Sequence, residues 1–253
     1  PASDGLINEY YTPTLVCNEI VKATATLLRG RVKPGQRIRA LEPSAGIGRV
    51  PSAFLGHSKL PLDWTLVERS DASSLLLSHL FTEARIHRGT FESFIAESLT
   101  EIVSSYDLVV ANPPYGGRGG AITIDPDKDY RETQAGAYFM RRGLDLLAPG
   151  GLGVYVVPRG FLDGTGKSAQ RLRDQIFARH HLLDAFRLPS NLFPGTDAVT
   201  DLLFFESRGG EIKGSLSGED EQIQRGHFYQ LRPSNILGKV STTTDRKGRG
   251  RYV

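Results

Sequence analysis

Short apolar runs alternate along this chain with longer segments in which apolar residues recur at helical spacing. The runs predict strands, and the longer segments predict helices that bury one side. A repeated order of strand and helix predicts a parallel sheet with both faces covered. The predicted strands are 37–41, 62–67, 84–87, 106–111, 152–157, 182–187 and 201–206, and the predicted helices are 13–28, a segment starting at 49, 70–82, 93–102, 134–147 and 167–179.

These elements predict the α/β fold class, with a Rossmann-like, mostly parallel sheet of seven strands and helices on both faces. Only the segment 188–200 separates the last two strands, so we expect that pair to be antiparallel. In the helix 70–82, one side is expected to carry Leu75, Leu76, Leu80 and Phe81.

Length and composition fit one such domain with an appendage. The 253 residues, 39% of them hydrophobic, are enough for one large core. The single cysteine, Cys17, lies in an amphipathic stretch and is expected to pack in that core, so no disulfide framework is expected. The sequence has no apolar segment of membrane-spanning length and no N-terminal signal, which predicts a cytoplasmic chain without a membrane partner. Pro1 in place of Met suggests a processed chain or a fragment.

The segment Asn112-Pro113-Pro114-Tyr115 directly follows the strand 106–111 and has the residue types needed to hold a planar amine. An amine conjugated to a ring is a poor nucleophile, so an enzyme that alkylates it must bind both N–H groups. The Asn112 side-chain oxygen and the Pro113 carbonyl can each accept one hydrogen, the prolines fix φ, and Tyr115 can stack on the ring. The alternative is a proline-rich turn that ends a buried strand.

A glycine-containing loop follows the first predicted strand. In Glu42-Pro43-Ser44-Ala45-Gly46-Ile47-Gly48, the two glycines allow a tight turn and close approach of a nucleotide-like ligand. The dinucleotide fingerprint needs a third glycine where this chain has Pro51, so a dehydrogenase is disfavoured. Glu68 ends the next strand, where a carboxylate can bind the ribose hydroxyls of an adenosine. Alternatively, Glu68 is a solvated residue at the start of a helix.

These motifs, in this order, resemble the gamma-class S-adenosylmethionine-dependent DNA adenine-N6 methyltransferases. Their Tyr-Thr-Pro element is also present ahead of the first strand. The resemblance implies a methyltransferase fold, DNA as substrate and catalysis by Asn112, Pro113, Pro114 and Tyr115. It implies S-adenosylmethionine as cofactor, with contacts from Tyr11, Thr12, Pro13, Glu42, Pro43, Ser44, Ala45, Gly46, Gly48, Glu68, Thr90, Phe91 and Asn112.

The resemblance extends over about residues 8 to 206. The segment 193–200 and the strand after it resemble the hairpin and last strand of the family. There an aromatic residue packs against the flipped base, which implies that Phe193 and Tyr115 hold the substrate base. One position departs from the family: an Asp that accepts from the cofactor's adenine amino group is replaced by Thr90. Either Phe91 with a backbone group holds the adenine, or Glu92 reaches in, or affinity for the cofactor is modest.

Two further segments lie outside the strand and helix pattern. A long loop follows the tetrapeptide, and it either closes over the flipped nucleotide with Arg118 on a phosphate or is a mobile linker. Its acidic residues lack the glycine and the final Glu of a calcium loop and are expected to be solvated: Asp125, Asp127 and Asp129. The six histidines are scattered, and no metal site is expected.

The second segment is the stretch from Arg208, which has nine Lys or Arg and five acids, a net charge of +4. The whole chain is +3, so the rest is about −1 and does not attract DNA by its overall charge. We therefore divide the chain into a catalytic domain, 1–207, with a helical lead-in over 1–35, and a basic extension, 208–253. The extension either starts a further module or is a disordered, solubilising end. It is too short for a target-recognition domain, so a specificity domain or partner subunit is expected outside this chain.

The expected reaction is methyl transfer from S-adenosylmethionine to N6 of a flipped-out adenine. We expect the chain to be the catalytic fragment or subunit of a larger restriction-modification or phage-defence enzyme. The tetrapeptide also suits other planar amines, namely cytosine N4, guanine N2 in RNA and the glutamine amide in proteins. A further alternative is a catalytically silent module that keeps the cofactor fold to bind DNA or a partner.

Overall fold

A computed structural model gives the fold, and it describes residues 11–29, 31, 33, 35–209, 218–244 and 250–252. Some of the expectations above therefore lie outside the described residues. They are the first ten residues of the helical lead-in and, in the basic extension, Lys213, Arg246, Lys247 and Arg249.

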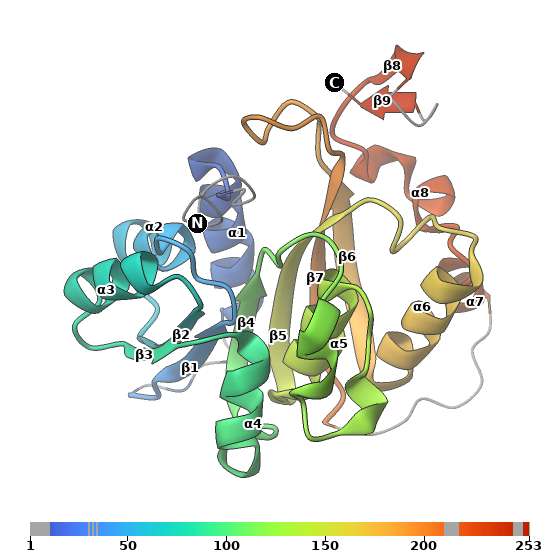
Figure 1. The fold of residues 1–253 in the computed structure, drawn as a ribbon. Coiled ribbons are helices and arrows are strands. Elements are labelled where there is room, and N and C mark those ends of the chain that lie inside the picture. Colours follow the sequence, from blue (N-terminus) through green and yellow to red (C-terminus); the bar gives the residue numbers. More distant parts are fainter. Residues whose placement is uncertain are drawn as a thin grey trace, which may run out of the picture.

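The main sheet has seven strands in the order β3-β2-β1-β4-β5-β7-β6 (Figure 1). Its strands are β1 (Ile38–Glu42), β2 (Leu62–Glu68), β3 (Arg85–Arg88), β4 (Tyr106–Ala111), β5 (Leu147–Pro158), β6 (His180–Arg187) and β7 (Thr200–Ser207). The first five pair in parallel, and β7 is antiparallel to both of its neighbours, β5 and β6. The predicted mostly parallel α/β sheet with an antiparallel last strand is confirmed.

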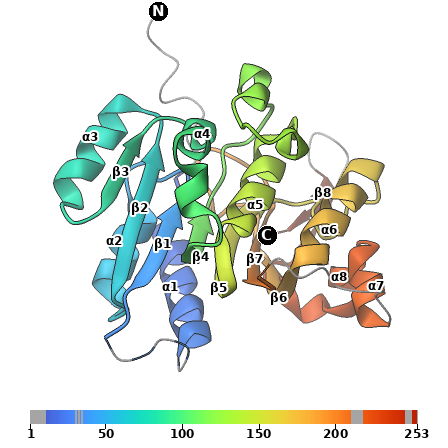
Figure 2. The same cartoon turned by 90° about the horizontal axis from the view of Figure 1, so that it is seen from below.

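Helices cover both faces of this sheet (Figure 2). They are α1 (Thr14–Leu28), α2 (Arg49–His57), α3 (Asp71–Leu80), α4 (Phe91–Ile102), α5 (Ala135–Asp145) and α6 (Lys167–Arg179). Apolar residues of α1, α2 and α3 belong to one buried cluster, and those of α4, α5 and α6 belong to the other. Each central strand supplies both clusters alternately, with Leu108 and Val110 on one face and Val109 and Ala111 on the opposite face. This two-sided burial explains why the strand sequences are almost wholly apolar.

Helix α3 differs from the sequence prediction in the face that it buries. Leu75, Leu76 and Leu80 are 50%, 42% and 56% exposed, whereas Leu77 is fully buried. Two serines lie on the buried face, and the Ser74 hydroxyl donates to the Glu68 carbonyl at 2.9 Å. The small serine side chains allow this close contact with the end of β2. The prediction that Leu75, Leu76 and Leu80 share a side with the buried Phe81 was therefore wrong.

Part of the described C-terminal stretch packs against α6 and against β6 at the sheet edge. It contains α7 (Glu219–Gln224), α8 (Phe228–Leu231), a short helix η3 (Pro233–Asn235) and the two-stranded β8 (Val240–Thr244) and β9 (Gly250–Tyr252). The fully buried Arg173 of α6 donates to the carbonyl of Gln224 at 2.7 Å, and the Leu237 amide donates to the carbonyl of Arg187 at 2.9 Å. The domain boundary near residue 207 remains a prediction. No helix among the described residues has the length and apolar character to cross a membrane.

Candidate active site

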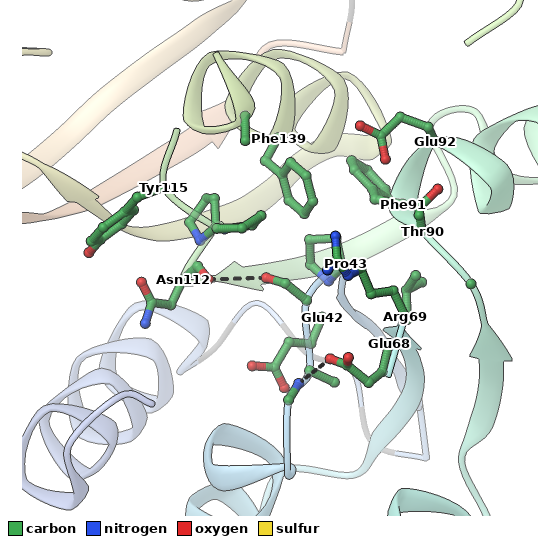
Figure 3. A pocket seen from close by; sticks show the side chains of 18 of the residues that line it. Glu42, Pro43, Glu68, Arg69, Thr90, Phe91, Glu92, Asn112, Tyr115 and Phe139 are labelled. Atoms are coloured by element: carbon green, nitrogen blue, oxygen red, sulfur yellow. Dashed lines mark hydrogen bonds between the residues drawn. The ribbon is translucent and has the colours of Figure 1, made fainter. Parts of the chain in front are cut away.

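A cavity of about 390 Å³ lies beside the carboxyl ends of β1, β2 and β4 (Figure 3). Ligands of open α/β sheets bind at this edge of the strands. Fourteen of the residues that the sequence assigned to the site line this cavity: Tyr11, Thr12, Glu42, Pro43, Ser44, Ala45, Gly46, Glu68, Thr90, Phe91, Asn112, Pro113, Pro114 and Tyr115. The structure therefore brings the motifs together, although they span about a hundred residues of sequence.

The glycine loop after β1 is fixed by the carboxylate that ends β2. One Glu68 oxygen accepts from the Gly46 amide at 2.7 Å, and the other accepts from the Ser70 amide at 2.7 Å. Gly46 and Gly48 both have positive φ, at 53° and 78°, which favours glycine. A Cβ on Gly48 would also lie 2.5 Å from the Phe81 ring. Gly48 therefore shapes the loop from outside the cavity lining, whereas Glu68 both holds the loop and faces the cavity.

Glu42 is a buried carboxyl group in the cavity wall, with only 3% of its surface exposed. Its Oε2 atom is buried and has no hydrogen-bond partner among the described residues. Burial, together with the negative charge of Glu68, raises the pKa of Glu42 well above its ordinary value. A buried carboxyl without a partner is costly unless a ligand supplies one. This position therefore fits a ligand group that carries positive charge or donates hydrogen bonds.

The tetrapeptide 112–115 is tied to two other parts of the site. The Ser44 hydroxyl donates to the Asn112 carbonyl at 3.1 Å, which connects the glycine loop to the end of β4. The Asn112 side-chain amide donates to the Thr12 hydroxyl at 3.1 Å, which connects it to the segment before α1. These bonds hold Asn112 at the cavity wall together with Tyr115.

The end of the cavity away from the tetrapeptide is formed by the start of α4. The Thr90 hydroxyl accepts from the Ser93 amide at 3.1 Å and caps this helix. Phe91 is buried and packs on Phe139 of α5, with ring centroids 4.9 Å apart. Glu92, next along the helix, also lines the cavity.

Several lining residues were not identified by the sequence analysis. Arg49 begins α2 directly after the glycine loop, donates to the Thr12 carbonyl at 3.5 Å and lies over the Tyr11 ring. Arg69 is exposed and lines the cavity directly after Glu68. The sequence could have indicated both arginines, because Arg49 directly follows the glycine loop and Arg69 directly follows Glu68. Phe139 had no such signal, because a buried aromatic residue on a helix looks like any core residue.

The loop after the tetrapeptide is not a phosphate-binding lid built on Arg118. The side chain of Arg118 is 1% exposed, and its Nε donates to Glu92 at 2.9 Å. Its other nitrogens donate to the carbonyls of Tyr130, Glu132 and Ala121. The prediction of Arg118 on a phosphate was therefore wrong, since burial leaves this guanidinium no access to DNA.

The acidic cluster in the same loop was also misread as wholly solvated. Asp125 is 2% exposed and makes two hydrogen bonds with the buried Arg142, at 2.7 and 2.9 Å. It also accepts from the Tyr138 hydroxyl at 2.9 Å. Asp127 and Asp129 are exposed, as expected. The long loop is thus fastened to α5 by buried charged groups whose pairing could not be read from local sequence.

Two predicted site residues lie outside the cavity lining besides Gly48. Pro13 precedes the first residue of α1. Phe193 is 2% exposed and belongs to the buried cluster with Leu188 and Leu192. A role for Phe193 at the substrate base stays a prediction. Among the described residues, no group of three or more His, Cys, Asp or Glu side chains is arranged to hold a metal ion.

Comparison with known proteins gives a family and several relatives. The Eco57I restriction-modification methylase family matches residues 69–193. The chain is 30% identical over 239 residues to defense against restriction protein B of Escherichia phage P1, a match that covers 92% of this chain and 9% of the phage protein. It is 32% identical over 99 residues to the type I restriction enzyme StySPI methylase subunit of Salmonella potsdam, covering 39% of this chain and 18% of that subunit. The chain therefore spans a small part of these relatives.

Solved structures share the fold. A type I restriction-modification methyltransferase subunit from Streptococcus thermophilus superposes with a TM-score of 0.64 at 19% identity, over 79% of this chain and 44% of that one. A Listeria monocytogenes protein described as a class I S-adenosylmethionine-dependent methyltransferase superposes with a TM-score of 0.66 at 16% identity, over 83% and 65% of the chains. Sequence match and fold agree. Over residues 69–193 the chain is similar to the restriction-modification methylases, and its fold is that of S-adenosylmethionine-dependent methyltransferases.

Proposed function

We propose that this chain transfers the methyl group of S-adenosylmethionine to N6 of an adenine flipped out of DNA. The observation that carries the proposal is that Asn112, Tyr115, Glu42 and Glu68 line one cavity. A planar amine and a nucleoside-bearing methyl donor can therefore meet there. The match to restriction-modification methylases supports DNA as the methyl acceptor.

The described residues fit the proposed cofactor. Glu68 lies at the end of the second strand, where its carboxylate can accept from ribose hydroxyls. The buried Oε2 of Glu42 has no partner among the described residues, and a cationic group of the cofactor would supply one. Phe91 and Phe139 give an apolar surface for an adenine ring. When bound, the cofactor supplies an electrophilic methyl group on a sulfonium.

In the proposed reaction, Asn112 and Tyr115 act on the acceptor. The Asn112 side-chain oxygen and the Pro113 carbonyl each accept one N6 hydrogen, which localises the lone pair on nitrogen. Tyr115 stacks on the base and keeps its amine in line with the methyl group. With the cofactor bound, a bond between its methyl carbon and N6 would form as the bond between that carbon and sulfur broke. The methylated nitrogen then loses one proton to water, so the chain needs no strong base beforehand.

Transfer of labelled methyl groups tests this function. We expect the full-length protein with labelled cofactor to place label in N6-methyladenine of DNA. Asn112→Ala should lower transfer to background and leave cofactor binding, measured by calorimetry, within about threefold of wild type. Gln230→Ala, which changes an exposed amide outside the cavity lining, serves as the control and should retain full activity. Label in cytosine, RNA or protein would contradict the choice of adenine, and absence of cofactor binding would favour a silent module.

We further propose that DNA recognition comes from elsewhere in a longer polypeptide or from a partner subunit. The chain spans 9% of the phage relative and 18% of the methylase subunit. Its net charge of +3 is small for a protein that neutralises many phosphates. Binding of duplex DNA by this chain alone should therefore be weak and without sequence preference in a mobility-shift assay at physiological salt. Tight, sequence-specific DNA binding by the isolated chain would refute the proposal that DNA recognition lies outside it.

A further inference from the structure

Thr90 follows β3 and lines the cavity, but its side chain serves as a helix cap. The Thr90 hydroxyl accepts from the Ser93 amide at 3.1 Å, and the Thr90 carbonyl accepts from the Ser93 hydroxyl at 2.9 Å. Threonine brings no charge, and this one is already engaged with the first turn of α4. The cofactor's adenine amino group, a donor of two hydrogens, needs its acceptor elsewhere.

Glu92 lies two residues further on, in the first turn of α4, and lines the same cavity. It is 5% exposed, and Arg118 binds its Oε1 atom at 2.9 Å. Arg118 is held in turn by three backbone carbonyls, and its guanidinium lies 3.5 Å from the centre of the Tyr138 ring. The helix N-terminus also favours a negative group at this position. The carboxylate is therefore fixed in place by charge and by a guanidinium whose other two nitrogens also donate hydrogen bonds.

The second oxygen of Glu92 is available to a ligand. Within the described ranges, Arg118 is the only hydrogen-bond partner of Glu92, and it binds Oε1. Glu92 lines the cavity, and with Oε1 bound to Arg118 the second oxygen is the one left to meet a ligand. Figure 3 shows Glu92 beside Phe91 and Thr90, at the end of the cavity away from Asn112 and Tyr115. With a ribose at Glu68 and a methyl group near Asn112, the base of the cofactor would lie at this end.

We infer that Glu92 accepts a hydrogen bond from the exocyclic amino group of the cofactor's adenine, and that Arg118 is the positioning residue that holds Glu92 for this contact. The inference rests on the proposed function, because it concerns the same cofactor. It also connects the adenine to the loop after the catalytic tetrapeptide, since Arg118 belongs to that loop. Thr90 then serves the helix and not the ligand.

The test compares two ligands, S-adenosylhomocysteine and its analogue in which hydrogen replaces the 6-amino group. Calorimetry should show that the wild-type chain binds the amino compound about 10 to 100 times more tightly, as expected for a hydrogen bond to a charged acceptor. In Glu92→Gln, Arg118 still requires an acceptor and takes the amide oxygen, so the amide nitrogen faces the cavity. Two donors then meet, and the preference for the amino compound should vanish or reverse.

Thr90→Val is the matched control, because it keeps the shape of the side chain and removes its hydroxyl. It should keep the wild-type preference. A preference lost in Thr90→Val and retained in Glu92→Gln would assign the contact to Thr90 and overturn the inference. If Glu92→Gln does not fold, the wild type and Thr90→Val still decide between the two residues. Equal binding of both ligands by the wild type would contradict this inference but not the proposed function. Binding of neither ligand would contradict both.

Discussion

Replacing Glu42 with Gln should stabilise the free protein at neutral and alkaline pH. The pKa of Glu42 is raised by burial and by the charge of Glu68, so the folded chain keeps this proton over a pH interval in which the unfolded chain has lost it. The favourable contribution of the protonated form is complete below the unfolded pKa, about 4.3, and is lost as pH rises through the raised folded pKa. One proton of difference lowers the free energy of unfolding by up to about 1.4 kcal/mol per pH unit across that interval.

Urea unfolding from pH 4.5 to pH 8 measures this effect. Near pH 4.5, the free energies of unfolding of Glu42→Gln and wild type should agree within about 1 kcal/mol, because a protonated carboxyl and an amide are nearly the same shape. At higher pH the free energy of unfolding of the wild type should fall below that of the variant. Its decrease with pH should be steeper than the variant's by up to about 1.4 kcal/mol per pH unit. Parallel curves over the whole range would show that Glu42 does not hold its proton in the folded state, and the reasoning would be refuted.

The same site gives a companion measurement on the ligand. A cationic cofactor group beside Glu42 favours the carboxylate, so binding should release a proton below the raised pKa. Calorimetry in two buffers of different ionisation enthalpy counts that proton. Wild type should release up to one more proton than Glu42→Gln.

Three other substitutions test the packing around the site, each by chemical denaturation. Asp125→Ala should lower the free energy of unfolding by about 3–5 kcal/mol, because it leaves the buried guanidinium of Arg142 unpaired. Asp129→Ala removes an exposed carboxylate and should change the free energy of unfolding by less than about 0.5 kcal/mol. Leu77→Ala should cost about 2–5 kcal/mol, and Leu76→Ala, on the exposed side of the same helix, well under 1 kcal/mol; equal losses would contradict the buried face of α3. Gly48→Ala should cost about 1–3 kcal/mol, because its φ is 78° and the added methyl meets an aromatic ring.

Most of the fold could be predicted from the sequence, because strands that are buried on both faces have almost wholly apolar sequences. The short apolar run 106–111 predicts a buried strand, and its predicted limits agree with β4. The glycine loop and the tetrapeptide were equally readable, since each depends on local backbone geometry. Their meeting at one cavity follows from the parallel order of β1, β2 and β4, whose carboxyl ends share an edge.

Features that depend on distant partners were not readable in the same way. The outward leucines of α3 fit an ordinary amphipathic pattern, and only the contact of Ser74 with the end of β2 determines which side is buried. Arg118 and Asp125 look like solvent-exposed loop residues until Glu92 and Arg142 are placed beside them. Such pairs join residues 17 to 26 positions apart, and no sequence pattern around either residue predicts its partner.

The buried ion pairs of the loop after the tetrapeptide have a consequence for binding entropy. Arg118 and Asp125 fasten this wall of the cavity to α4 and α5 in the free protein. Its conformational freedom is given up once, during folding, and not again at each encounter with a ligand. Amide hydrogens along this wall should accordingly exchange at rates typical of the core, and ligand binding should slow them little.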